Sequence, residues 1–200
     1  MIDVQDRLAL GVKLASAVMH LHSSEWLSEC WGKTDIYFLR KLIRRQKFNG
    51  KVKSIPEPVF EKPLIRRSFG LSKTMLTPGT STTLKNCDKS IFSLGVVLVE
   101  LCLQQRIDNL RNPQNGNTQP SDDEKYKIIK DRYGEITEIA GTEYSRAVWY
   151  CISGKNLPMT MAGARNLDST EFKNSFYINV VDPLEKNYEV CDCDPNRIRR

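Results

Sequence analysis

The sequence predicts a mostly α-helical domain of the α+β class with a small β element. Apolar residues recur at three- and four-residue steps over Asp3–His22, a spacing typical of an amphipathic helix. A second stretch, Lys89–Leu103, is apolar nearly all round, which indicates a helix buried on every side. Only Asp35–Leu39 combines aromatic and branched residues in a way that favours a strand.

The first predicted helix has recognisable ends. Asp3 is a suitable N-terminal cap, and Asp6 adds a favourable negative charge to the first turn. Ser23 and Ser24 are expected to end the helix. Its apolar positions are Leu8, Val12, Leu14, Ala15, Val18 and Leu21.

A basic, proline-containing segment follows the predicted strand. Arg40–Lys53 contains seven Lys or Arg residues and no acid, with a turn signal at Asn49-Gly50. Three prolines follow, at positions 56, 58 and 63, so Ser54–Pro63 is expected to be an extended connection. We therefore interpret residues from about 40 to 63 as an insertion in a single domain that spans residues 1–200.

The second half of the chain is expected to be helical around the buried segment Lys89–Leu103. A polar loop is predicted from about 104 to 121, with Asn-Pro and Asn-Gly pairs as turn signals. Pro183 is expected to break or kink the last helical region. The further predicted helices are Asp122–Arg132, Thr142–Ile152 and a region from Asp168 to about Val190, which opens on a capping-box pattern at Asp168–Glu171.

Composition excludes several classes of protein. Of the 200 residues, 40% are hydrophobic and 27% charged, which is ordinary for a globular domain and argues against wholesale disorder. The longest apolar stretch, Leu94–Leu103, is too short to span a bilayer. The N-terminal residues lack a signal-peptide pattern. We therefore expect a cytoplasmic protein, with the nucleus as the alternative.

The six cysteines predict neither disulfides nor a metal site. They form no CxxC pair, and two histidines are too few to complete a zinc-finger pattern. Cys102 and Cys151 lie in apolar helical patterns and are expected to be buried. Cys191 and Cys193 stand one residue apart, which is a poor spacing for a metal. No cofactor is predicted either, because no glycine-rich phosphate-binding motif occurs.

Four segments in order resemble the C-lobe of the protein-kinase fold. Leu14–His22 is similar to the helix before the kinase catalytic loop, and Asp35–Leu39 to the strand after it. Ser68–Ser72 resembles the Asp-Phe-Gly segment with its first residue replaced. Phe92–Leu101 resembles the central buried helix of the lobe. The resemblance implies a kinase-like C-lobe, with the N-lobe absent.

Three stretches, at residues 21–31, 92–95 and 180–185, are similar to a fungal family of kinase-like domains of unknown function. Such domains often follow a helical region linked to fungal self-recognition and cell-death signalling. The resemblance thus implies a pseudokinase-type interaction domain.

The same resemblance implies that the chain is not an enzyme. A kinase needs an Asp that accepts the substrate proton, together with an Asn and an Asp that hold magnesium. When Asp35 is placed at the metal-binding Asn, the catalytic Asp falls at Cys30 and the catalytic-loop Lys at Gly32. The second metal ligand falls at Ser68, whose hydroxyl is a poor ligand for a hard dication. We predict no catalytic, cofactor-binding or metal-binding residues.

Two alternatives remain open at this stage. Arg40–Lys53 is a candidate contact for nucleic acid or an anionic membrane, although a solvated insertion explains the charge as well. The chain is alternatively a truncated fragment of a larger kinase-like protein, in which case apolar surface would be exposed where the small lobe sits. A protein partner, an upstream helical domain or the missing lobe, is the main expectation.

Aromatic and imidazole side chains near the helix end receive structural interpretations. His20 and His22 point in different directions on a helix, so we expect helix-end packing in place of a shared metal. Trp26 and Trp31 are expected to anchor the core.

Overall fold

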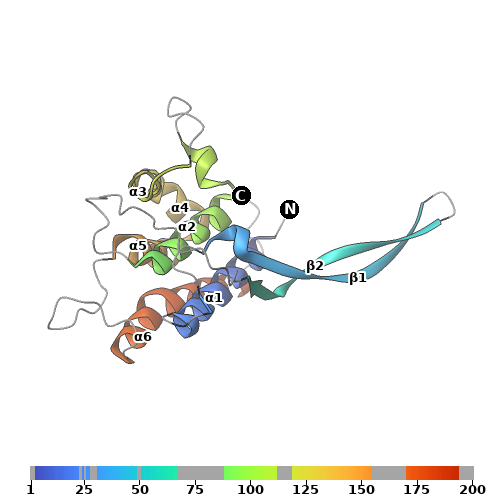
Figure 1. The fold of residues 1–200 in the computed structure, drawn as a ribbon, viewed down its shortest axis with the longest axis horizontal. Coiled ribbons are helices and arrows are strands. Elements are labelled where there is room, and N and C mark those ends of the chain that lie inside the picture. Colours follow the sequence, from blue (N-terminus) through green and yellow to red (C-terminus); the bar gives the residue numbers. More distant parts are fainter. Residues whose placement is uncertain are drawn as a thin grey trace, which may run out of the picture.

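Helices form one body of the molecule, and a long two-stranded hairpin projects from it (Figure 1). The computed structural model describes residues 3–22, 24, 26–27, 31–48, 51–66, 88–111, 119–154 and 170–193; residues 42–48, 51–58, 60–61 and 191–193 are described by their backbone alone. The described part of the chain is mostly α with a small β element, as predicted, and that element is an antiparallel two-stranded sheet.

The first helix, α1, spans Val4–Leu21, so its prediction is confirmed. The Asp3 carboxylate accepts a hydrogen bond from the Val4 backbone N–H at 2.7 Å and caps the helix. At the other end, the His22 N–H donates to the Val18 carbonyl at 2.8 Å. The N-terminal cap predicted at Asp3 is therefore confirmed. At the C-terminal end the capping residue is His22, and Ser23, which was expected to end the helix together with Ser24, lies outside the described residues.

The central helix, α2, spans Lys89–Leu103, again as predicted. Leu94, Leu98 and Val99 are completely buried. The helix packs against α1 on one side and α5 on the other. It is the centre of the hydrophobic core.

The hairpin is the main departure from expectation. After the short 3₁₀ helix η1 (Lys33–Asp35), strand β1 runs over Ile36–Phe48 and pairs with β2, Lys51–Ile65. The predicted strand at Asp35–Leu39 is confirmed from Ile36 onward, but the strand is much longer than expected. Ser54–Pro63, expected to be an extended connection, belongs to β2. In a two-stranded sheet both strands are edges, and edge strands tolerate prolines.

The next helices along the chain also pack against α2. Helix α3 spans Asp122–Asp131 and α5 spans Thr142–Ser153, close to their predicted bounds. Helix α4, Tyr133–Ala140, and the 3₁₀ helix η2, Ile107–Leu110, were not predicted. The second of these lies inside the expected polar loop.

The last helical region continues through Pro183. Helix α6 (Thr170–Phe176) leads into a π-helical turn, η4 (Tyr177–Val181), and then into α7 (Asp182–Cys193). The Asp182 N–H donates to the Tyr177 carbonyl, five residues back. The interruption expected from Pro183 thus takes the form of a widened turn just before the proline. The predicted capping residue Asp168 lies outside the described residues.

Candidate functional site: the pocket at the root of the hairpin

Hydrogen bonds among Gly32, Asp35 and Arg66 hold the two ends of the hairpin together, and we call these three residues the loop base. The Gly32 N–H donates to Asp35 Oδ2 at 3.0 Å, and the Asp35 N–H donates to the Gly32 carbonyl at 2.9 Å. Just after β2, the Arg66 N–H donates a hydrogen bond to the Asp35 carbonyl at 2.7 Å. The Asp35 carboxylate, which the kinase resemblance places at the position of a metal-binding Asn, therefore stabilises the turn before β1.

The resemblance implies replaced catalytic groups at three positions. Gly32 is the one of these that the structure describes. It has no side chain and lies at the start of η1. Cys30 and Ser68, the other two positions, lie outside the described residues, as does the whole Ser68–Ser72 segment.

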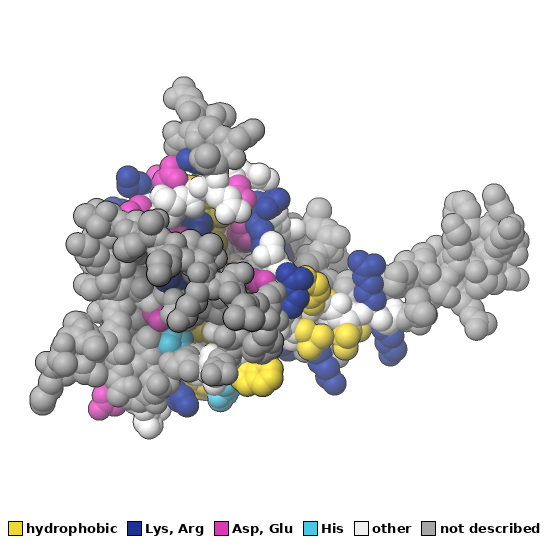
Figure 2. All heavy atoms as spheres, in the orientation of Figure 1, with side chains coloured by type: hydrophobic (Ala, Val, Ile, Leu, Met, Phe, Trp, Pro, Cys, Tyr) yellow, Lys and Arg dark blue, Asp and Glu magenta, His cyan; other side chains and the backbone are white. Residues whose placement is uncertain are grey.

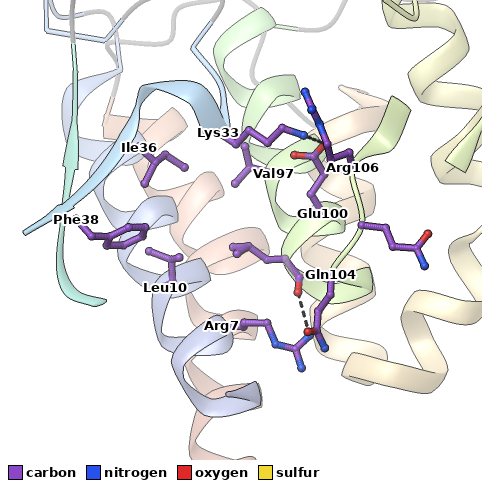
Figure 3. Close-up of a pocket in the computed structure, with 11 residues that line it drawn as sticks. Arg7, Leu10, Lys33, Ile36, Phe38, Val97, Glu100, Gln104 and Arg106 are labelled. Atoms are coloured by element: carbon purple, nitrogen blue, oxygen red, sulfur yellow. Dashed lines mark hydrogen bonds and ion pairs between the residues drawn. The ribbon is translucent and has the colours of Figure 1, made fainter. Parts of the chain in front are cut away.

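Beside this loop base lies a pocket of about 380 Å³, which we call the root pocket (Figure 3). Its walls come from α1, the start of β1 and the C-terminal half of α2. In the close-up, Ile36 and Phe38 of β1 lie on the same side as Leu10 of α1. The lining residues are Arg7, Leu10, Lys33, Ile36, Phe38, Val97, Glu100, Leu101, Gln104, Gln105 and Arg106.

An ion pair between Lys33 and Glu100 borders the root pocket (Figure 3). The Glu100 carboxylate also accepts the Ile107 backbone N–H at 2.8 Å. The Glu100 side chain is only 10% exposed, so burial of its charge is offset by these two donors. The contact joins η1, α2 and η2 at one point.

Arg7 forms the opposite border of the root pocket and is itself buried. Its guanidinium donates to the Leu101 and Cys102 carbonyls, both at 3.0 Å. These carbonyls lie in the last turn of α2, which has no intrahelical donors for them. Gln104 caps the same end in a left-handed conformation, with a φ of 53°. Arg7 therefore stabilises the end of α2 and ties it to α1.

The root pocket combines apolar walls with a charged border. Its aliphatic and aromatic walls accept an apolar group, and its charged border offers hydrogen bonds to that group's polar end. The nearby Cys102 thiol is not a nucleophile, because burial raises its pKa to about 12. Among the described residues, no cluster of three or more His, Cys, Asp or Glu side chains converges on a point.

The two tryptophans that were predicted to anchor the core differ in burial. Trp31 is buried, and its indole N–H donates to the Ser90 carbonyl at 3.0 Å, so its core role is confirmed. Trp26 is 65% exposed, so the same prediction for it was wrong. Hydrophobicity alone did not reveal which indole N–H would find a buried acceptor.

The interpretation of the helix-end histidines as packing residues holds for His22. Its ring lies 5.0 Å from the Phe172 ring, and its Nε2 lies 3.2 Å from Asp88 Oδ1. His20 belongs to the last turn of α1 and is exposed. The end of α1 is thereby joined to the start of α2 and to α6.

Arg7 and Glu100 were not singled out in the sequence, although both carry a signal. Arg7 lies on the same helical stripe as Gly11, Leu14 and Val18, where a charge on a buried face is unusual. Glu100 interrupts the most apolar stretch of the chain. A charged residue inside an apolar helical stripe is a cue for a buried partner.

Comparison with known proteins adds one match. A family model described as a domain of unknown function matches residues 1–191. No curated protein and no solved structure matches the chain. In the part of the chain that the structure describes, none of the helices is long and apolar enough to cross a membrane.

Proposed function

The chain belongs to the DUF7580 family of domains of unknown function, and we propose that it is a non-catalytic kinase-like interaction domain. The observation that carries the proposal is at the loop base before β1. There Gly32 offers no side chain, and the Asp35 carboxylate is engaged by a backbone N–H. A pocket of about 380 Å³ lies directly beside these residues.

The order of elements supports the kinase-like part of the proposal. A helix, a short 3₁₀ helix, two antiparallel strands, a central buried helix and further helices follow one another in that sequence. The resemblance of Phe92–Leu101 to the central helix of a kinase C-lobe agrees with the complete burial of Leu94 and Leu98.

The partner is a protein in this proposal, and the root pocket receives one of its apolar side chains. A pocket of about 380 Å³ is sufficient for a large aliphatic or aromatic group. Buried aromatic or aliphatic anchors supply most of the binding energy in many protein interfaces. A cytoplasmic or nuclear location belongs to the same proposal, because Cys102 and Cys151 are free thiols, which are usual in a reducing compartment.

A nucleotide titration tests the non-catalytic part. The melting temperature of the full chain is measured with increasing ATP and magnesium, alongside phosphate transfer to a general protein substrate. We expect no stabilisation and no transfer, because a kinase needs carboxylates on the metal and a proton-accepting Asp. Stabilisation by nucleotide together with phosphate transfer would overturn the proposal.

Photocrosslinking tests the partner. A photoreactive amino acid is placed at Leu101, in the root pocket, and in a matched variant at Ile139, which is 52% exposed on α4. We expect crosslinked adducts in cells from position 101 and few from position 139. Equal adducts from both positions would contradict a specific contact at the pocket.

A further inference from the structure

The net positive charge of this protein is concentrated in the hairpin. Residues 36–66 contain nine Lys or Arg and two Glu, a net charge of +7, whereas the whole chain carries +6. The remainder of the chain therefore has a net charge of −1. Because the hairpin projects from the helical body, this charge lies on a separate arm of the molecule (Figure 1).

The root of the hairpin has two different faces. Side chains alternate along a strand, so Ile36 and Phe38 face the root pocket while Tyr37 and Leu39 face outward. Tyr37 is 43% exposed and Leu39 is 55% exposed. Leu64, directly opposite Tyr37 on β2, is 48% exposed. We call Tyr37, Leu39 and Leu64 the outer root face.

Exposed cations lie on and next to the outer root face. The Arg66 guanidinium lies 5.2 Å from the centre of the Tyr37 ring, a distance typical of a cation–π contact. Arg40, Lys41 and Lys62 are also exposed on the same two strands. Figure 2 shows these features together, with hydrophobic side chains at the root of the hairpin and Lys or Arg side chains beside them.

We propose that the outer root face binds the surface of an anionic phospholipid bilayer, with the cations on lipid phosphates and carboxylates. An aromatic ring and two leucines suit the boundary between headgroups and acyl chains, where apolar side chains are buried and Tyr keeps its hydroxyl in water. Lys and Arg around them reach anionic headgroups with their long side chains. This goes beyond the protein partner proposed above, because it assigns a second surface and a different ligand.

Nucleic acid is the main competing ligand, and the apolar residues argue against it. A duplex would attract the cations of the arm through its phosphates. It would leave Leu39 and Leu64 without partners, because phosphates and sugars offer little apolar surface to them. The combination of charge and exposed leucines is the feature that favours a membrane surface.

Vesicle co-sedimentation with the full chain tests the proposal. The probes are vesicles of phosphatidylcholine alone and vesicles that contain about 30% phosphatidylserine. We expect binding to the anionic vesicles to be at least about fivefold tighter, and to weaken as salt is raised. Absence of binding to anionic vesicles would overturn the proposal.

Paired variants separate the apolar and charged contributions. The double substitution Leu39→Ser and Leu64→Ser should weaken vesicle binding by about fivefold or more, because it removes the groups that enter the acyl boundary. The control changes Ile139 and Ile178, which are 52% and 63% exposed outside the hairpin, to Ser and should leave binding unchanged. Equal losses in both variants would contradict a site at the hairpin root.

For charge, Arg40→Glu with Lys41→Glu is compared with Lys127→Glu and Lys130→Glu, which alters the net charge equally on exposed positions of α3. Only the hairpin pair should lose binding. Short duplex DNA that binds as tightly as anionic vesicles, with no effect of Leu39→Ser and Leu64→Ser on either, would assign the arm to nucleic acid and overturn the membrane proposal. These measurements involve neither nucleotide nor the protein partner, so their failure would not affect the proposed interaction role.

Discussion

Asp88 joins three parts of the molecule through one carboxylate. Its Oδ1 accepts the backbone N–H groups of Ser90 at 2.9 Å and Ile91 at 3.1 Å, and so caps α2. His22 Nε2 lies 3.2 Å from the same oxygen. Burial raises the pKa of this carboxyl, but the hydrogen bonds from His22, Ser90 and Ile91 outweigh burial and lower the pKa to about 2.

A depressed pKa makes the contribution of Asp88 dependent on pH. The ionised form stabilises the fold above the ordinary Asp pKa of 3.8, and that stabilisation is lost as the pH falls toward 2. We expect Asp88→Asn to lower the free energy of unfolding by about 1–2 kcal/mol at neutral pH. The difference from the unsubstituted protein should close between pH 4 and pH 2, in urea denaturation across that range.

The control for this prediction is Asp6→Asn, which makes the same change of charge on an exposed position of α1. It should alter stability by less than about 0.5 kcal/mol. A stability difference for Asp88→Asn that stays constant from neutral pH to pH 2 would contradict the assigned role of the carboxylate.

At the scale of elements, the packing of α2 on α5 depends on a glycine. A Cβ atom at Gly95 would lie 2.7 Å from Ile152 Cγ2 and 3.0 Å from Cys151 Cβ. Those atoms belong to the buried face of α5, where close packing leaves little room to move. This gives a physical reason for the glycine in the Phe-Ser-Leu-Gly run at 92–95.

Two alanine substitutions measure that close approach. Gly95→Ala should lower the free energy of unfolding by about 1–3 kcal/mol, because overpacking outweighs the better helix propensity of Ala. Gly134→Ala, in α4, places its Cβ in open space and should stabilise the protein by about 0.5–1 kcal/mol. Urea unfolding of both variants checks the prediction, and similar stabilisation by both would show that the helices can separate at no cost.

Helix α4 was not predicted from the sequence, and the hairpin strands were predicted too short. In both cases the local residue preferences argue against the element that forms. Helix α4 contains Gly134 and the β-branched residues Ile136, Thr137 and Ile139, which disfavour a helix on propensity alone. It is stabilised by burial of Ile136, which is completely buried. The hairpin strands likewise contain prolines, which edge strands accommodate because an edge leaves some backbone groups unpaired.

At the scale of the whole molecule, the hairpin joins the helical core at its root. Among its described side chains, those that pack against the core are the partly buried Ile36, Phe38 and Ile65. Replacing residues 40–58 by an Asn-Gly turn would join Leu39 to Val59, which already face each other across the strands. We expect the melting temperature to change by less than about 3 °C.

The matched variant for this deletion is Phe38→Ala, which keeps the hairpin but removes a root side chain. It should lower the melting temperature by about 3–6 °C, because apolar packing against the core is lost. A large loss of thermal stability on deletion of residues 40–58 would show that the distal arm supports the fold.

The sequence by itself determined the elements whose information is local. The periodicity of Asp3–His22 and the all-round apolarity of Lys89–Leu103 predicted α1 and α2 with nearly correct bounds, and the mostly α fold class followed. Helix periodicity and capping depend on residues within a few positions of each other. The concentration of positive charge in residues 36–66 is likewise a property of the sequence alone.

Only the tertiary structure decided the features that depend on contacts between distant residues. Arg7 donates hydrogen bonds to the carbonyls of Leu101 and Cys102, and Lys33 forms an ion pair with Glu100. In each case the partners lie far apart in the sequence. No local pattern specifies such partners, because burial and hydrogen bonding of a charge are set by the packed neighbours. The root pocket and the exposed outer root face exist for this reason in the folded molecule, and neither could be predicted from the order of residues.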